Sequence, residues 1–245
     1  MSDSDREEKI VKISKQLGET TPEQMAATNL RAVIALIPFV GGALNTLATE
    51  LIPNWKMDRL YRFVGALKVD LDRLGSKVDA EYLKREEFGH IFERTFRAVA
   101  LNYQTEKLDA LKNALLSSMV RTDIRQDMKE YLLHLIETFD SLHIRFLVLL
   151  RNPAEYYRRE EIPDPSPSSY GSVMAELRRC LPDLGDGAIR AVWNDLYNYG
   201  VVNTDSNALQ VLAYSNPPGS QALVGRLTDF GKVVVTFAMQ PPSVD

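Results

Sequence analysis

The chain has 245 residues, of which 45% are hydrophobic and 25% are charged, and its 29 basic and 33 acidic side chains leave a formal charge of −4. This composition is typical of a globular protein, and the negative charge excludes a general electrostatic attraction to nucleic acid. The single cysteine, Cys180, excludes an internal disulfide and a cysteine-cluster zinc site. Because the first 20 residues also lack the apolar stretch of a secretory signal, we expect a cytoplasmic protein.

The N-terminal region combines two expected helices, over about residues 5–17 and 22–37, with the most apolar stretch of the chain, residues 32–52. Pro38 and the pair Gly41-Gly42 divide this stretch into pieces too short to cross a membrane. We expect a buried hairpin, while a partner-binding surface and a segment that enters a membrane conditionally stay open as alternatives. In these two alternatives the contact residues are Phe39, Gly41, Gly42 and Leu44.

A long helix is predicted over residues 57–78, because its apolar side chains recur every three or four residues through three heptads. We expect this seam to pack within the chain, and an intermolecular coiled coil is the alternative. The same periodicity predicts further helices over residues 88–99, 105–119, 124–139 and 141–151. We therefore predict a helical bundle domain over residues 1–161.

Two of these helices carry further expectations about their ends and faces. Thr105 is the predicted N-cap of the helix that follows it. In the helix over residues 124–139, Met128 and Tyr131 share the predicted buried face with leucine and isoleucine side chains. Thr122 and Asp123 are placed in the first turn of that helix, where an acidic side chain complements the helix dipole.

Proline and serine dominate residues 162–167, which we predict to be a linker. Beyond it, residues 168–245 contain two predicted helices, two extended segments around the turn NPPGS, and a closing element. For the closing element, the run VVVTF favours a strand, whereas Thr228 in the N-cap position favours a helix, and both stay open. This order of elements predicts a mainly α fold, in which a helical bundle is followed by a small winged-helix-like α+β module.

No common catalytic motif occurs in the sequence, and we expect no enzymatic activity, no cofactor and no bound metal. Residues 225–232 imitate a phosphate-binding loop, but five residues separate the glycines and Val233 stands where serine or threonine must hold magnesium. Cys180 follows two arginines, which would lower its pKa, yet no histidine is nearby in sequence to act as a base. The three histidines, near carboxylates on predicted helices, are more typical of charged helix surfaces than of metal sites: His90, His134 and His143.

In a winged helix that reads DNA, the second helix of the module would contact the bases. The residues that could do so are Arg190, Trp193, Asn194 and Tyr197. However, residues 166–245 hold five basic against seven acidic side chains, so neutralisation of phosphates would be poor. A protein-contacting or structural module is therefore favoured over a nucleic-acid-binding one.

Several motifs of the helical region carry a resemblance to a known family. They are the interrupted apolar stretch ALIPFVGGALNTLATELIP, the heptad helix after it, and the segments TEKLDALKNALLSS and FDSLHIRFLVLL. Over about residues 30–151 the chain resembles the abortive infection alpha family, and its C-terminal stretch with LTDFG is similar to the winged-helix tails attached to such proteins. The resemblance implies a role in defence against phage through protein or membrane contacts, with no catalytic residues to assign.

We therefore expect a non-enzymatic interaction protein, an effector or accessory factor of bacterial anti-phage defence that binds a protein partner or associates with itself. One alternative is a winged-helix transcriptional regulator that binds DNA. The other is a membrane-disrupting protein that releases residues 32–52 conditionally.

Overall fold

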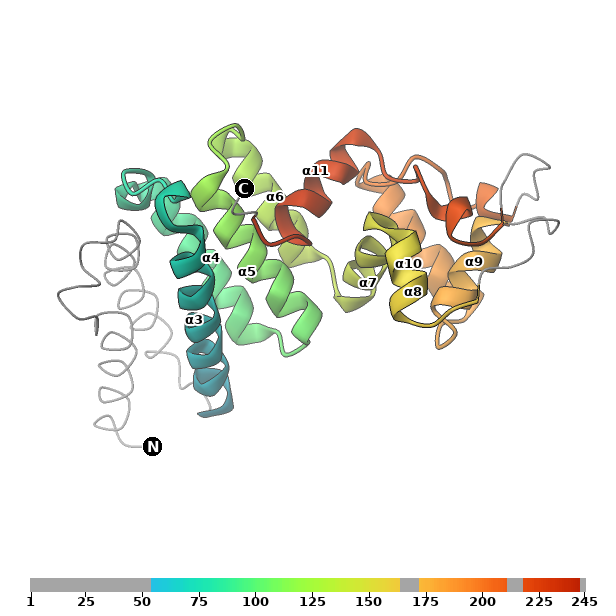
Figure 1. The fold of residues 1–245 in the computed structure, drawn as a ribbon, viewed down its shortest axis with the longest axis horizontal. Coiled ribbons are helices and arrows are strands. Elements are labelled where there is room, and N and C mark those ends of the chain that lie inside the picture. Colours follow the sequence, from blue (N-terminus) through green and yellow to red (C-terminus); the bar gives the residue numbers. More distant parts are fainter. Residues whose placement is uncertain (1–53, 164–171, 211–217, 243–245) are drawn as a thin grey trace. The chain divides into compact units, whose positions relative to one another are not determined.

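The computed structural model describes residues 54–163, 172–210 and 218–242. The described chain is mainly helical (Figure 1) and forms two compact units, which are treated one at a time. The described part of the N-terminal unit is residues 54–138 with 240–242, and the C-terminal unit spans residues 139–239. Among the described residues, no helix is both long and apolar enough to span a membrane. The candidate contact residues Phe39, Gly41, Gly42 and Leu44 lie outside the described residues.

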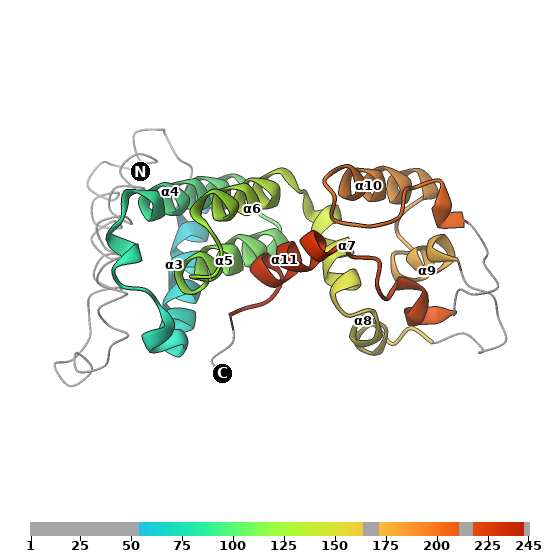
Figure 2. The same cartoon turned by 90° about the horizontal axis from the view of Figure 1, so that it is seen from above.

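The N-terminal unit is built on four helices in alternating directions, seen in Figures 1 and 2. They are α3 (Asn54–Leu74), α4 (Glu86–Leu101), α5 (Thr105–Val120) and α6 (Gln126–Thr138). The short 3-10 helices η2 (Gly75–Lys77) and η3 (Tyr82–Lys84) join α3 to α4. The short connections between successive helices make neighbours antiparallel, as in an up-down-up-down bundle.

The predicted seam of α3 faces the interior of this unit and packs on α4 and α5. Its side chains are buried: Leu60, Val64, Leu67, Leu71 and Leu74. The expected packing within the chain is thus confirmed. The helix ends where Gly75 adopts a φ of 61°, a left-handed conformation that glycine allows without strain and that commonly terminates helices.

Aromatic side chains of α4 form the centre of the bundle core. Phe92 stacks on Phe96 with ring centroids 4.4 Å apart, and Phe63 of α3 meets Phe96 edge-on at 5.5 Å. The spacing of four residues places Phe88, Phe92 and Phe96 on one face of the helix. Because α5 packs against α3, α4 and α6, it is buried along most of its surface, with alanine and serine at the close approaches.

Three sequence predictions for this unit were wrong in detail. Thr105 is the first residue of α5 rather than its N-cap, and helix α6 begins at Gln126, so that Asp123 lies in the preceding turn and pairs with Arg121 at 2.7 Å. Met128 and Tyr131 are exposed. The buried side of α6 consists of Lys129, Leu132, Leu133, Leu135 and Ile136, so the predicted leucine and isoleucine positions are buried and the other two are not.

The C-terminal unit contains α7 (Ser141–Arg151), α8 (Pro153–Arg159), α9 (Val173–Cys180), α10 (Asp186–Asn198) and α11 (Asp229–Ala238). The helices α7 and α8, which the sequence analysis assigned to the bundle, pack here with the later elements. The unit therefore contains residues from both sides of the predicted linker. Because residues 164–167 lie outside the described residues, the linker itself stays a prediction.

Side chains cap the N-termini of four of these helices, which explains why they begin where they do. Asp140 caps α7 by accepting from the backbone amides of Leu142 and His143. Asn152 and Ser172 cap α8 and α9 in the same way. These caps satisfy backbone amides that have no partner inside the helix.

The expected β part of the module is not found in the described residues. Residues 211–217 lie outside them, and one of the predicted extended segments is instead the 3-10 helix η5 (Gly219–Leu223). A second 3-10 helix, η4 (Ala208–Gln210), lies where the other segment was predicted to begin. Between Val202 and Leu227 lies an antiparallel bridge, the one extended pairing found in the described part of the chain. The mainly helical fold is thus confirmed, and the winged-helix-like module stays a prediction.

The closing element is the helix α11, the outcome that the Thr228 cap favoured. The Thr228 hydroxyl accepts from the backbone amide of Gly231 at 2.8 Å and also donates to the carbonyl oxygen of Gly200 at 2.6 Å. The β-branched residues of VVVTF become helical because Val234 and Val235 are buried in the unit. Packing of one helix face therefore outweighs the strand propensity of the run.

We expect Gly231→Ala to destabilise the C-terminal unit by about 2 kcal/mol, because a β-carbon at this position would overlap the carbonyl oxygen of Val201. The matched control is Gly187→Ala in α10, where nothing lies within 4 Å of the added carbon. That change should stabilise the unit by about 0.5 kcal/mol, since alanine loses less conformational entropy than glycine. Urea unfolding of both variants measures the difference, and equal effects would contradict the close approach of α11 to Val201.

Candidate functional site

The four residues predicted to contact DNA do not form one exposed surface on α10. Trp193 is completely buried, and its indole nitrogen donates to the carbonyl oxygen of Thr204 at 2.7 Å. The guanidinium of Arg190 donates to the carbonyl oxygen of Ser206 at 2.8 Å. Asn194 and Tyr197 are exposed. Two of the four side chains thus hold the following loop against α10.

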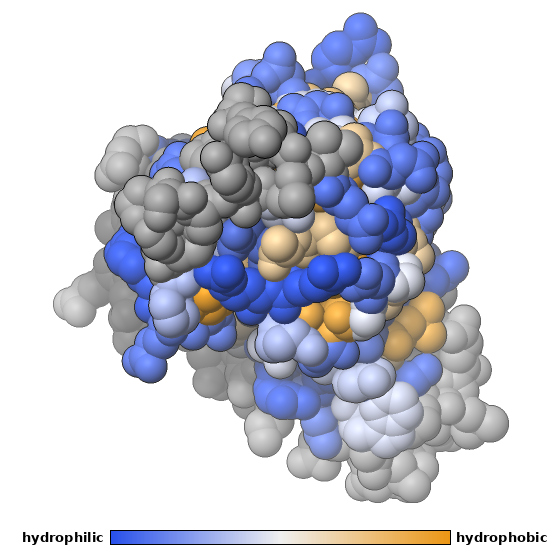
Figure 3. Space-filling model, turned by 90° about the vertical axis from the view of Figure 1, so that its right-hand side faces the viewer, coloured by the Kyte–Doolittle hydropathy of each residue, from blue (hydrophilic) through white to orange (hydrophobic). Residues whose placement is uncertain are grey.

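The face of the C-terminal unit seen in Figure 3 is mainly hydrophilic. Hydrophobic side chains occur on it in small, separate areas, and the described residues of this face offer no broad apolar surface. Residues 225–232, which imitate a phosphate-binding loop, also have structural roles here: Gly225 adopts a φ of 74°, and Lys232 pairs with Asp229 at 2.8 Å. Neither feature indicates a phosphate site.

His143 is held between two carboxylates of the C-terminal unit. Its Nδ1 lies 2.8 Å from Asp140 Oδ1, and its Nε2 lies 3.4 Å from Asp195 Oδ2 on α10. The imidazole also stacks on Phe139 with ring centroids 5.1 Å apart. Among the described residues, no cluster of three potential ligands has the geometry of a metal site. The contacts of His143 instead connect α7 to α10.

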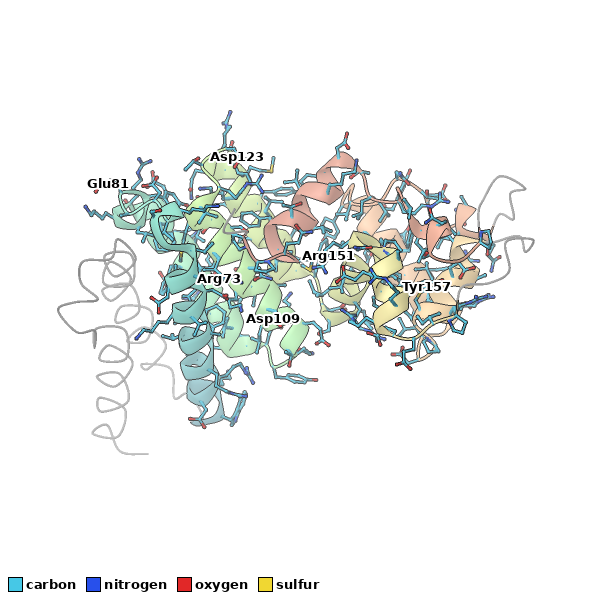
Figure 4. All side chains as sticks on the ribbon, viewed as in Figure 1. Arg73, Glu81, Asp109, Asp123, Arg151 and Tyr157 are labelled. Carbon is cyan, nitrogen blue, oxygen red and sulfur yellow. The ribbon has the colours of Figure 1, made fainter. Side chains whose placement is uncertain are left out.

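Cys180 belongs to a buried polar cluster in the same unit, beside Tyr157, which Figure 4 labels. The Tyr157 hydroxyl donates to Glu176 Oε2 at 2.6 Å, and Glu176 Oε1 accepts from the amide of Gly219 at 3.2 Å. Burial raises the pKa of the Cys180 thiol to about 12, whereas the neighbouring arginines were expected to lower it. Burial and the hydrogen bond to Glu176 likewise raise the pKa of Tyr157. The cluster therefore joins α8, α9 and η5 and contains no activated nucleophile.

We expect Cys180 in the folded protein to resist a thiol reagent such as 5,5′-dithiobis(2-nitrobenzoate) at pH 8, because the thiol is 5% exposed and stays protonated. In guanidinium chloride the same thiol should react fully, with one equivalent per chain. The absorbance of the released thiolate follows both reactions. Rapid labelling of the folded chain would show that the cluster opens or that the thiol is activated.

Exposed aromatic and apolar side chains gather at one end of the N-terminal bundle. Trp55 is 55% exposed near the start of α3, while Leu101 and Tyr103, at the end of α4 and just beyond, are 66% and 74% exposed. Arg59 connects these segments, because it donates to the carbonyl oxygen of Ala100 at 3.0 Å and lies 5.1 Å from the centroid of the Trp55 ring. We call Trp55, Arg59, Leu101 and Tyr103 the aromatic end.

The side chain of Arg59 is buried, and its contacts hold the segments of the aromatic end together. Its guanidinium also reaches the carbonyl oxygen of Val99 at 3.4 Å, so it satisfies carbonyls at the C-terminus of α4. Burial, together with the positive charge of Arg62, lowers the pKa of this guanidinium. The sequence analysis did not find this surface, because its members lie in segments about 45 residues apart and were not assigned to any motif.

A polar pocket of about 220 Å³ lies at the opposite end of the bundle, where α3 and α5 end and α4 and α6 begin. In Figure 4 the labelled Glu81 and Asp123 mark this end, and Asp109 lies nearer the other. The backbone amide of Asp79 donates to the carbonyl oxygen of Met119 at 3.2 Å, which joins the α3–α4 connection to the end of α5. The pocket is lined by Asp79, Tyr82, Arg85, Glu87, Met119, Thr122, Ile124, Gln126 and Lys129.

Lys129 is the most unusual side chain of this pocket, because a buried ammonium is costly unless it is compensated. Its Nζ donates to the carbonyl oxygen of Ser118 at 2.8 Å and lies 4.2 Å from the centroid of the Tyr82 ring. Burial lowers the pKa of Lys129, and the positive charge of Arg85 acts in the same direction, while Asp79 opposes them. The Tyr82 hydroxyl donates to Gln126 at 2.8 Å, and burial raises its pKa to about 12.

The aromatic end and the polar pocket are thus the two candidate sites of the N-terminal unit. The ionisable groups of the pocket are mostly hydrogen-bonded or exposed to solvent. The chain matches no protein-family model, no curated protein and no solved structure.

Proposed function

We propose that the protein is a non-enzymatic interaction protein that binds a protein partner through the aromatic end. The observation that carries this proposal is the exposure of Trp55, Leu101 and Tyr103 on one end of the bundle. Side chains of these sizes are costly to leave in water, and tryptophan, tyrosine and arginine dominate the binding energy of protein interfaces.

Preorganisation of Trp55 supports the same proposal. The Arg59 guanidinium is fixed by two carbonyl oxygens of α4 and stacks near the indole, so the ring loses little freedom when a partner binds. The ammonium of Lys56 lies 5.5 Å from the centroid of the same ring. With Arg62 one turn further along α3, these cations favour a partner segment that is acidic around an apolar anchor.

An effector or accessory role in bacterial anti-phage defence is the setting that the family resemblance implies for such an interaction. The DNA-binding alternative has less support, because Trp193 is buried and Arg190 is bonded to the backbone of its own unit. The membrane-disrupting alternative depends on residues 32–52, which lie outside the described residues.

The proposal is tested by co-purification of the tagged full chain from the cells that encode it, with three single variants. Trp55→Ala and Tyr103→Ala should each remove a stoichiometric partner, whereas Tyr131→Ala, an exposed tyrosine on α6, should retain it. Far-ultraviolet circular dichroism checks that all variants are folded. Equal retention in all three variants, or binding only to a second copy of the chain or to lipid vesicles, would overturn the proposal.

A further inference from the structure

The polar pocket is lined by charged side chains of both signs beside a short apolar wall. Within the described residues, the side chains of Arg85 and Glu87 make no hydrogen bond or ion pair, although both line the pocket. Deeper in the wall, Lys129 donates to the carbonyl oxygen of Ser118, and Oδ1 of Asp79 accepts from the backbone amides of Glu81 and Tyr82, both at 3.0 Å. The pocket therefore holds two cationic and two anionic groups that do not neutralise one another by direct contact.

We infer that this pocket binds a small aliphatic amino acid, whose carboxylate meets Arg85 and Lys129 and whose ammonium meets Asp79 and Glu87. An anion alone would lie near two carboxylates, and a cation alone would lie near an ammonium and a guanidinium. A molecule with both charges on neighbouring atoms pairs with both sets, so the charges of the lining favour it. This site is independent of the proposed protein contact, which lies at the other end of the bundle.

Size and lining restrict the ligand further. A volume of about 220 Å³ corresponds to about seven water molecules, which is room for the atoms of one small amino acid. Met119 and Ile124 provide the apolar part of the lining, where an aliphatic side chain would be removed from water. The amide of Gln126 is held by Tyr82 and by Glu130 at 2.7 Å, so the polar wall beside this part is ordered before a ligand binds.

Isothermal titration of the full chain with L-leucine tests the inference, and two matched molecules serve as controls. 4-Methylpentanoate lacks the ammonium of leucine, and 3-methylbutylamine lacks its carboxylate. We expect saturable binding of L-leucine or of its smaller homologues L-valine and L-alanine, with binding of either control weaker by about tenfold or more. Binding of none of the three amino acids, or binding of a control as tight as that of leucine, would overturn the inference.

Three exposed substitutions locate the site without disturbing the core. Arg85→Gln and Glu87→Gln should each weaken binding by about tenfold, because each removes one charge that faces the ligand. Lys84→Gln changes a neighbouring side chain that pairs with Glu81 and does not line the pocket, so it should leave the affinity within about twofold. Equal effects of all three would contradict the assignment. Trp55→Ala should not change leucine affinity, so failure of this inference and failure of the protein contact are distinguishable.

Discussion

Trp193→Ala is expected to destabilise the C-terminal unit by about 4 kcal/mol, a large fraction of the roughly 5–15 kcal/mol that stabilises an ordinary domain. Trp193 is one of the largest completely buried side chains, and its ring meets Phe146 of α7 edge-on at 6.4 Å. Alanine would leave a cavity between α7 and α10. It would also leave the carbonyl oxygen of Thr204 without the indole donor.

Denaturant unfolding followed by circular dichroism measures this effect, and Tyr197→Ala is the matched control. Tyr197 is on the same helix and is 41% exposed, so its replacement should change the free energy of unfolding by less than about 0.5 kcal/mol. If the tryptophan variant were no less stable than the tyrosine variant, Trp193 would not be a core residue. The DNA-binding interpretation of α10 would then regain support.

Lys107→Met is expected to destabilise the N-terminal unit by about 3 kcal/mol, although methionine is as long and more apolar. Lys107 is 1% exposed, and its ammonium donates to the carbonyl oxygens of Ile136 and Glu137. These groups end α6, so the cation also complements the negative end of the helix dipole. Methionine would fill the space and leave two carbonyl groups with one donor fewer in a site that excludes water.

The control for this prediction is Lys84→Met, which changes the same residue type at a position where the side chain is 63% exposed. Its surface pair with Glu81 should contribute less than about 1 kcal/mol. Guanidinium chloride unfolding of both variants gives the comparison. If the Lys107 variant were as stable as the wild type, the free energy lost by removing the ammonium from water would equal the free energy gained from its hydrogen bonds, and the prediction would be wrong.

Several basic side chains donate hydrogen bonds to the backbone carbonyl oxygens at the C-termini of helices, and none of these contacts was predicted from the sequence. Arg59 donates to a carbonyl oxygen near the end of α4, Lys129 to that of Ser118 near the end of α5, and Lys107 to one near the end of α6. In the C-terminal unit, Arg151 donates to the carbonyl oxygen of Met239 beyond α11 at 2.7 Å. Apolar periodicity assigns charged residues to the surface, so a cation buried against backbone carbonyls cannot be found from the pattern alone.

Local signals predicted the helices well, and tertiary packing decided what they could not. The helix α7 begins and ends at the predicted residues, because Asp140 and Asn152 mark its two boundaries in the sequence itself. On α6, Leu132, Leu135 and Ile136 are buried as predicted, but Met128 and Tyr131 are exposed. Lys129 is buried instead, because its ammonium donates to Ser118 and lies over the Tyr82 ring. Such burial depends on partners distant in sequence.

The candidate sites could not be predicted from the sequence, for a related reason. Trp55 and Tyr103 lie on one surface because α3 and α4 are antiparallel, which sets the start of α3 beside the end of α4. Likewise, Asp79, Arg85 and Lys129 come from different segments, and none lies in a motif. Conversely, the residues of α10 were predicted to form a contact surface and do not form one. A helix pattern does not reveal that the loop containing Thr204 covers Trp193.

We propose the aromatic end of the bundle as the surface that a protein partner contacts. Site-specific photocrosslinking in the cells that encode the protein tests it most directly, with the photoreactive residue p-benzoylphenylalanine placed at Tyr103 or, as a control, at Tyr131. Both positions are exposed, so both probes can react with whatever protein covers them. We expect position 103 to give one crosslinked product, with a mass equal to that of this chain plus one partner protein, and position 131 to give none. Crosslinks of equal yield from both positions, or none from position 103, would contradict it.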